Sequence, residues 1–313
     1  MLERILYYVF IIPLSRLPLW ILYVKADFFY LLLCTILPYR KKIALQNIRF
    51  AFPELKHKEQ SRLLRKNYRH ISNILAESIK NLSISQKKLC KRMQLKNPEI
   101  FQDLYDKGKS VVIMSAHYAN WEFFITAQNL IIPHRAIGIG KPLSEKFLNR
   151  KINALRERNG MKVVSADNYK EEIAFRQAMG EKMAILALAD QAPKPESAYW
   201  TKFFNKETPF SFGAEFLAHQ FNFAVVFVTI KKIKRGNYEA EAHIITETPK
   251  QESYASISEK YVRLLEKQIK DKAEDWLWTH KRWKHTIPEN LEEQKQQHRA
   301  FFHQRFKKQT NGN

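Results

Sequence analysis

The sequence predicts an α/β protein with a mixed central sheet flanked by helices, and three observations support this class. Segments typical of strands alternate with segments of helical periodicity between Ser110 and Ile245. No Gly- or Ser-rich linker divides that stretch, and the 313 residues include only 8 glycines. Hydrophobic residues make up 45% of the chain, which is ample for a core. We therefore expect one domain over residues 39–285, between an apolar segment, 1–38, and a polar tail, 286–313.

Residues 1–38 are the most apolar part of the chain. The runs ILYYVFIIPLS, LPLWILYV and FFYLLLCTILPY are separated only by Arg16 and by the pair Lys25 and Asp27. We expect a hydrophobic membrane-anchor helix here, and it should stay on the mature protein because no small-residue cleavage site follows the first run. The sequence YRKK at 39–42 then places positive charge on the cytoplasmic side of the membrane.

The form of this anchor stays open. No run reaches the roughly 18 apolar residues that mark a spanning helix, and Pro13 and Pro18 would break or kink one. A spanning helix and a monotopic or re-entrant anchor are equally compatible with the pattern. A pair of core helices in a soluble protein is a further alternative.

The remaining elements follow in order. Residues 43–95 are basic, with apolar residues at helical spacing, so we expect helices whose cationic side lies on phospholipid headgroups or simply in solvent. Period-two and apolar runs predict strands at 110–116, 135–140, 162–166, 182–190, 224–232 and 238–245. Helical periodicity predicts helices at 121–131, 144–160, 171–181, 212–221 and 254–283, and a terminal helix or frayed end beyond Pro288.

The charge and the missing motifs limit the function. A formal charge of +22 requires an acidic partner, either nucleic acid or an anionic membrane with its phosphorylated lipids. The run GIGKPLS has leucine where a dinucleotide loop needs its third glycine, and PFSFG lacks the first glycine of a nucleophile elbow. Neither a phosphate-binding Gly-Lys-Ser loop nor an H-E-x-x-H or C-x-x-C motif occurs. Nucleotide cofactors, a serine acyl-enzyme and a zinc site of these kinds lose support.

The stretch SVVIMSAHYANWEFF, from Ser110 to Phe124, carries the candidate chemistry. A strand ending at Ala116 places His117 at the carboxyl edge of the sheet, where open α/β sheets bind ligands. Asn120 is a natural N-cap for the next helix, which puts Glu122 in its first turn. On one continuous helix the two side chains would point about 140° apart, so the loop is what lets them meet. A histidine held by a carboxylate is a general base for a hydroxyl, although an isolated H-x-x-x-x-E is usually a chance match.

The motif is accompanied by three more blocks in a familiar order. HYANWE is followed by KPLSEKFLNRKINALRERNG, then by LADQAPKPESAYWTKFFNKETPFSFGAEFLAHQ, and then by AEDWLWTHKRWK. With these blocks the chain resembles the lipid A biosynthesis acyltransferases, lauroyl or myristoyl transferases of the lysophospholipid acyltransferase superfamily, over nearly its whole length. The resemblance implies the single domain of that superfamily. It also implies transfer of a fatty acyl chain from acyl carrier protein to a hydroxyl of a 3-hydroxyacyl chain on a phosphorylated, Kdo-bearing lipid A precursor.

The resemblance also assigns roles to individual residues. His117 and Glu122 match the family's H-x-x-x-x-D/E, so they would be the base and its orienting acid, with no covalent enzyme intermediate. Arg156 matches a basic residue near the site, where a guanidinium suits phosphate or an oxyanion. Arg158, Arg150, Asp190 and Gln191 are further substrate-binding candidates, and a structural turn is an alternative reading of the last two. No metal and no cofactor is implied, because acyl carrier protein brings the acyl group as a substrate.

The location and the partners follow from the same resemblance. The expected site of action is the inner membrane of a Gram-negative-type cell, with the catalytic domain facing the cytoplasm. The partners would be acidic acyl carrier protein, the glycolipid acceptor and the membrane surface. A lysophospholipid, glycolipid or amino-acid lipid acceptor remains an alternative. A membrane-tethered nucleic-acid-binding protein is a remote one, because no RNA-recognition motif or zinc knuckle is present.

Overall fold

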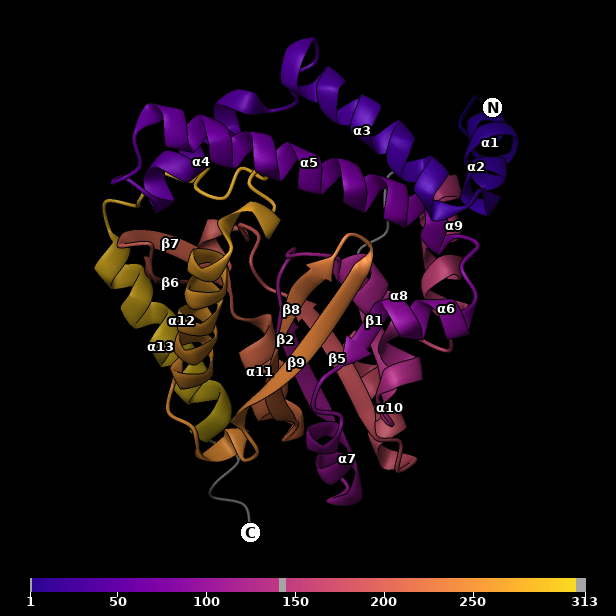
Figure 1. Ribbon diagram of the computed structural model, residues 1–313. Helices are drawn as coiled ribbons and strands as arrows, with labels where there is room; N and C mark the ends of the chain where they lie inside the picture. The colour runs from indigo at the N-terminus through magenta and orange to yellow at the C-terminus, as the bar shows by residue number, and fades with distance from the viewer. Residues whose placement is uncertain (1, 141–144, 308–313) are drawn as a thin grey trace.

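The centre of the molecule is a mixed β-sheet (Figure 1). The computed structural model describes residues 2–140 and 145–307, and within them it contains a 7-stranded sheet in the order β1-β9-β8-β2-β5-β3-β4. Neighbouring strands run parallel except for the antiparallel pair β8 and β9. The strands are β1 (Met93–Leu95), β2 (Val111–Ser115), β3 (Arg135–Gly140), β4 (Lys162–Ser165), β5 (Met183–Leu188), β8 (Ala224–Lys234) and β9 (Asn237–Thr246). The predicted α/β class with a mixed central sheet is confirmed.

Helices cover both faces of this sheet and the end at which its parallel strands finish. α11 and α12 pack on β2, β8 and β9, while α8 packs on β1 and β3. The helices are α1 (Leu2–Ile5), a π-helical segment (Leu6–Ile11), α2 (Ile12–Arg16), α3 (Leu19–Thr35), α4 (Lys41–Ala51), α5 (His57–Asn81), α6 (Gln86–Arg92), α7 (Glu99–Asp106), α8 (Trp121–Ile131), α9 (Lys146–Glu157), α10 (Tyr169–Ala178), α11 (Gly213–Phe221), α12 (Ser256–Asp271) and α13 (Leu291–Lys307). Short 3₁₀ turns occupy Pro195–Ser197, Pro249–Gln251 and Ala273–Asp275.

β2 lies in the interior of the sheet, and all five of its residues are buried. A parallel strand covered by helices on both faces reads as a continuous apolar run, which is why VVIMS could be recognised in the sequence. The other elements expected between Ser110 and Ile245 agree with the structure to within a few residues. Ser144 in the helix expected at 144–160, Met1 and the tail residues 308–313 lie outside the described residues.

A two-stranded hairpin, β6 (Ala198–Phe203) with β7 (Lys206–Ser211), was not predicted. Its turn residues Phe204 and Asn205 both have left-handed backbones, with φ of 50° and 58°. Two consecutive positive φ values are typical of the tight turns that join antiparallel strands. Glycine usually marks such a turn, and here none does.

The helix expected at 254–283 is wrong beyond α12. After Asp271 the chain is irregular apart from one 3₁₀ turn at Ala273–Asp275. We call residues 272–283, which include this turn, the strap. Main-chain groups of the strap bond elsewhere: Leu277 N–H donates to the His117 carbonyl, and Ala119 N–H to that of Asp275. These long-range bonds replace the helical ladder that the local pattern favoured.

α3, α4 and α5 lie over the end of the sheet at which β2 finishes, and we call them the α3 layer (Figure 1). α3 packs along α5 through Leu19, Leu22 and Ala26, which are buried. No helix in the described residues is long and apolar enough to cross a membrane. The spanning form of the anchor helix expected at the N-terminus is therefore not supported.

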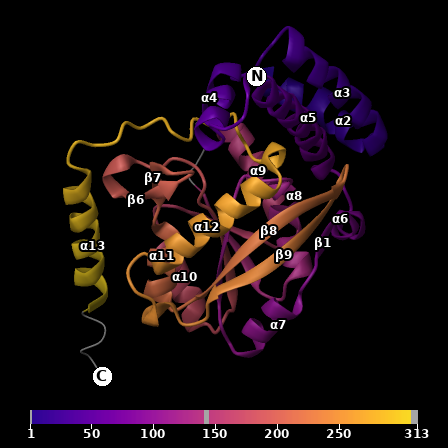
Figure 2. The same ribbon diagram turned by 60° about the vertical axis from the view of Figure 1, so that its left-hand side comes forward.

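The turn between β8 and β9 reaches this layer (Figures 1 and 2). Arg235 in that turn donates to both carboxylate oxygens of Asp27 on α3, at 2.7 and 2.9 Å, and its Nε donates to Asn73 on α5 at 2.8 Å. Gly236 follows with a φ of +73°, a conformation that favours glycine. The long hairpin thus fastens α3 and α5 to the sheet.

α13 runs beside β6 and α11 (Figure 2). Its Phe302 is buried, and its ring packs against those of Phe212 and Phe216. The polar, Gln-rich segment therefore forms a terminal helix with one aromatic face on the domain.

Candidate functional site

His117 begins the loop that joins β2 to α8 at the carboxyl edge of the sheet. Tyr118 forms an isolated bridge with Trp276 of the strap, and its hydroxyl donates to the Lys272 carbonyl at 2.7 Å. Ala119 has a left-handed backbone with φ of 48°, and Asn120 caps α8 by accepting the Phe123 N–H at 2.8 Å. The loop is therefore held in a conformation that the short sequence alone would not favour.

The imidazole of His117 pairs with Asp190, which follows β5. His117 Nδ1 lies 2.7 Å from Asp190 Oδ1, and the His117 backbone N–H donates to Oδ2 at 3.1 Å. The indole of Trp276 also donates to Oδ2, at 3.0 Å. Asp190 is only 2% exposed, so all these bonds form in a dry environment. A carboxylate on Nδ1 fixes the proton there and leaves the Nε2 lone pair for a substrate.

The electrostatics of this pair favour the charged forms. Burial by itself would lower the pKa of His117, but the Asp190 carboxylate and its hydrogen bond outweigh burial, so the pKa of His117 is raised. Burial would likewise raise the pKa of Asp190, but the facing imidazole and the donors around the carboxylate hold that pKa below its usual value. Asp190 therefore remains ionised and stabilises an imidazolium.

Glu122 does not make the direct contact with His117 that we expected. Its Oε1 instead lies 3.3 Å from Arg156 Nη2, and both side chains are partly exposed. Glu122 still acts on the imidazole at longer range, since its charge is a further cause of the raised pKa of His117. This arrangement has a physical reason: the loop turns His117 toward β5, whereas Glu122 in the first turn of α8 faces α9.

Arg156 joins the polar site to an apolar cavity. The cavity has a volume of about 410 Å³, and among the described residues that line it Arg156 is the charged one. The Nε of Arg156 is buried and has no hydrogen-bond partner among the described residues. Much of the wall is built from small residues at the ends of β3 and β5 and the start of α11, namely Gly138, Gly140, Ala187, Ala189, Gly213 and Ala214. Small side chains keep this space open between the sheet and the helices.

The other expected substrate residues lie differently. Arg158 is exposed, and its Nη1 donates to the Leu82 carbonyl at 3.0 Å. Arg150 is exposed on α9. Gln191 is half-buried beside Asp190 on the segment that follows β5. Of the seven residues expected at the site, the structure joins His117 with Asp190 and Glu122 with Arg156.

Two more side chains near the pair were not expected as site residues. The His280 Nε2 accepts the Ala192 N–H at 3.3 Å, and burial together with the Arg282 charge lowers the pKa of His280 to about 4. Arg282 is buried, with its guanidinium 4.2 Å from the Phe210 ring, and burial lowers its pKa to about 10. Both come from the motif WLWTHKRW, which the sequence singled out but placed on a helix.

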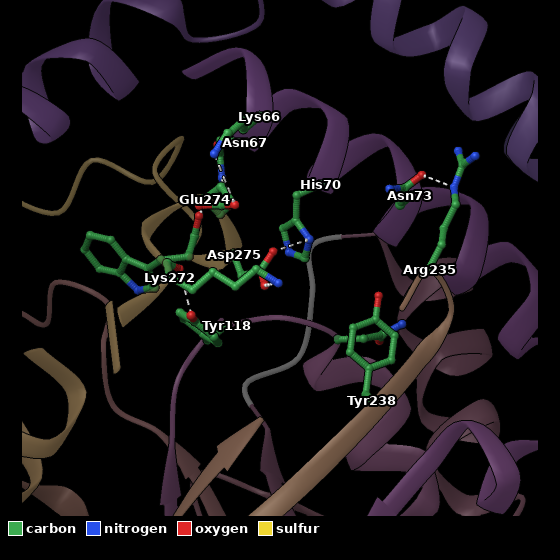
Figure 3. A network of polar contacts seen from close by, with 12 residues as sticks. Lys66, Asn67, His70, Asn73, Tyr118, Arg235, Tyr238, Lys272, Glu274 and Asp275 are labelled. Atoms are coloured by element: carbon green, nitrogen blue, oxygen red, sulfur yellow. Dashed lines mark hydrogen bonds and ion pairs between the residues drawn. The ribbon is translucent and has the colours of Figure 1, made fainter. Parts of the chain in front are cut away.

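α5 holds the strap in place from outside (Figure 3). Asn67 donates to the carbonyls of Glu274 and Trp276 at 2.9 and 2.7 Å. His70 Nδ1 lies 3.2 Å from Asp275 Oδ1, and burial lowers the pKa of His70 to about 4. The strap that supplies Trp276 to Asp190 is therefore itself positioned by buried polar groups.

The arrangement can carry out acid–base chemistry on a hydroxyl next to an apolar chain. It provides a base with a fixed tautomer, a nearby cation and an adjoining apolar space. Within residues 2–140 and 145–307, no group of three or more His, Cys, Asp or Glu side chains is placed to hold a metal ion.

Comparison with known proteins identifies a family. The family model for bacterial lipid A biosynthesis acyltransferases matches residues 3–285, nearly the whole chain. A search of curated proteins found no match.

Proposed function

The chain belongs to the bacterial lipid A biosynthesis acyltransferase family, and from this membership we propose that it moves a fatty acyl chain from acyl carrier protein to a hydroxyl of a Kdo-bearing lipid A precursor. The observation that carries the proposal is the pair of half-buried His117 and buried Asp190 beside Arg156 and its apolar cavity. Such a site suits a hydroxyl acceptor and a hydrocarbon chain. The acceptor hydroxyl would belong to a 3-hydroxyacyl chain of the precursor.

In this proposal His117 is the general base. Its Nε2 takes the proton of the acceptor hydroxyl while the hydroxyl oxygen bonds to the thioester carbonyl carbon. The carbon–sulfur bond then breaks, and the leaving thiolate takes the proton back from the imidazolium. Asp190 stabilises the imidazolium throughout. Because the acceptor hydroxyl attacks the thioester directly, the proposed reaction has no acyl-enzyme and needs no cofactor beyond the acyl carrier substrate.

Arg156 would serve the charged parts of the substrates. Its guanidinium sits between Glu122 and the cavity, where it can face the oxyanion that develops on the thioester carbonyl or a phosphate of the acceptor. Glu122 would hold Arg156 in this orientation. The acyl chain would occupy the cavity, whose 410 Å³ falls within the usual range for ligand pockets.

The net charge of +22 fits the two acidic substrates. Acyl carrier protein is acidic, and the acceptor carries phosphates and Kdo carboxylates. We propose that the protein works at the inner membrane with this domain facing the cytoplasm. Arg150 on α9 and Arg158 just after it are both exposed, and they remain candidates for contacts with either substrate.

The α3 layer supports association with a membrane surface. Its outer side presents Trp20, Val24, Phe28 and Leu31, all exposed, and the exposed cations Lys58, Arg62, Arg65 and Arg69 follow one side of α5. An apolar stripe beside a cationic stripe is the pattern of elements that lie in the headgroup region of anionic bilayers. This layer lies over the edge of the sheet that carries His117, so a lipid acceptor would enter from the bilayer side (Figure 1).

The test compares wild type with His117→Ala in detergent. Each is given acyl carrier protein loaded with labelled lauroyl or myristoyl chains and a Kdo-bearing lipid A precursor, and the product is identified by mass. We expect transfer by wild type and a loss of roughly a hundredfold or more in the variant. His57→Ala, which removes an exposed histidine at the start of α5, is the matched control and should retain transfer.

Two results would contradict the proposal. Full activity of His117→Ala would remove this histidine from the mechanism. Absence of transfer by a folded wild type would exclude the lipid A precursor as acceptor, and the same assay with lysophospholipids, glycolipids and amino-acid lipids would then identify the acceptor class.

A further inference from the structure

A fully buried carboxyl group lies behind the catalytic loop. Glu77 on α5 is 0% exposed and accepts three hydrogen bonds from three different parts of the chain. Tyr23 of α3 donates to Oε1 at 2.7 Å, while Tyr238 of β9 and Asn120 donate to Oε2 at 2.7 and 2.6 Å. Burial raises the pKa of Glu77, so keeping a carboxyl here is costly. An apolar side chain at this position would avoid that cost but would leave the three donors without an acceptor.

The contact with Asn120 has a fixed orientation. Asn120 Oδ1 accepts the Phe123 N–H as the N-cap of α8, so its Nδ2 must be the group that faces Glu77. Asn120 lies three residues after His117 and two before Glu122 in the sequence. The group that holds the Asn120 amide therefore fixes the end of the loop that carries His117. It also fixes the start of α8, which carries Glu122.

The loop needs such support, because its neighbour Ala119 has a left-handed backbone that alanine rarely adopts. On the strap side, Ala119 N–H donates to the Asp275 carbonyl at 2.9 Å. On the opposite side the support comes from Glu77 through Asn120. A misplacement of a catalytic group by about 1 Å can cost on the order of a hundredfold in rate.

We propose that Glu77 is a positioning residue for the reaction proposed above: it fixes the loop of His117 through Asn120 and ties that loop to α3 through Tyr23. The inference rests on the proposed function for its activity readout. Its structural part, the restraint of residues 117–124, does not depend on the identity of either substrate.

A swap of the two side-chain types tests this restraint. Asn120→Asp keeps the cap, because a carboxylate also accepts the Phe123 N–H, but it sets a second carboxylate against Glu77. Glu77→Gln with Asn120→Asp restores the pair in reverse: the new amide donates to the new carboxylate. Glu77→Gln alone is mild, since its amide can turn toward Tyr23, whose hydroxyl accepts as well as donates.

Two readouts separate the restraint from the reaction. Backbone hydrogen exchange of the peptide covering residues 117–124 should rise at least about tenfold in Asn120→Asp and return close to the Glu77→Gln level in the double variant. The turnover number for acyl transfer should fall at least about tenfold in Asn120→Asp, with little change in KM, and recover in the double variant.

The matched control is Glu215→Gln. Glu215 on α11 is also fully buried and accepts the backbone N–H and hydroxyl of Ser258, away from the loop. This variant should lower the melting temperature without raising exchange in 117–124, as a merely structural carboxylate would. A double variant that is folded but no better than Asn120→Asp in either readout would overturn the proposal. If wild type transfers nothing to the lipid A precursor, the proposed function fails, and the exchange measurement still decides on Glu77.

Discussion

His117 and Asp190 stand level at the ends of two adjacent parallel strands. The register pairs Ser115, the last residue of β2, with Leu188, the last residue of β5, and the side chains that meet at 2.7 Å each lie two residues further along the chain. The sheet itself therefore brings the base to its carboxylate, and no loop has to close for the contact to form.

Asp190→Asn should slow acyl transfer by roughly 10²–10⁴, because the imidazolium loses its carboxylate and the tautomer is no longer fixed. In wild type the activity should rise with pH as His117 loses its proton, with a midpoint above the ordinary histidine value of about 6.5. Without the carboxylate, burial dominates and that midpoint moves to lower pH. The measurement is the pH dependence of kcat/KM. Asp106→Asn, on α7 at the opposite edge of the sheet, is the control and should leave the profile in place.

Glu122→Gln should also slow transfer, by at least about tenfold, but through Arg156 rather than through the imidazole. Because Glu122 contributes less than Asp190 to the raised pKa of His117, the pH midpoint should move down by a smaller step than in Asp190→Asn. The two pH profiles, measured side by side, check this. Equal shifts in the two variants would mean that Glu122 contacts the imidazole during catalysis.

Ala187→Leu should shift the donor preference toward shorter acyl chains. Ala187 lines the apolar cavity, so three added carbons would occupy space that the end of the chain needs. Values of kcat/KM for a series of acyl carrier proteins with chains of different length provide the measurement. Ala174→Leu, at an exposed position on α10, makes the same chemical change outside the cavity and should not alter the preference. An unchanged profile in Ala187→Leu would show that the chain lies elsewhere.

Trp20→Ser and Phe28→Ser should each weaken binding to vesicles that contain anionic lipid. The two side chains are 68% and 71% exposed on the outer side of α3, and burying one such side chain contributes roughly 1.5–3 kcal/mol, or about tenfold or more in affinity. Co-sedimentation with vesicles measures the effect. Phe175→Ser is the control, because Phe175 is 64% exposed on α10, away from this layer. Binding that survives both α3 substitutions would place the membrane contact on another surface.

Much of the fold could be predicted because its signals are local. β2 and α8 were placed almost to the residue, since an apolar run followed by an Asn cap describes both elements within a short window. The edge position of His117 followed from the same window.

The partner of His117 could not be predicted in this way. Glu122 is near in sequence, whereas Asp190 is 73 positions away and meets the imidazole only because β2 and β5 are neighbours in the sheet. Asp190 was recognised as a site residue, but its role was not. A strand order cannot be read from the residues of one strand.

The strap was mistaken for a helix for a related reason. Its residues have helical spacing, yet Asn67 on α5 and the loop at His117 take up its main-chain groups. Glu77 escaped notice because a glutamate within a basic amphipathic helix normally faces solvent. Its three partners lie on three other elements of the chain.

Hairpin turns usually accept substitution, but Gly236 in the turn between β8 and β9 is an exception. A Cβ atom at this position would occupy the place of the Tyr23 hydroxyl, which would have to leave Glu77. The variant would combine a strained backbone with a loss of restraint on a loop it never touches. A harmful replacement at this glycine would thus resemble an active-site defect, although the residue carries no side chain and belongs to a distant turn.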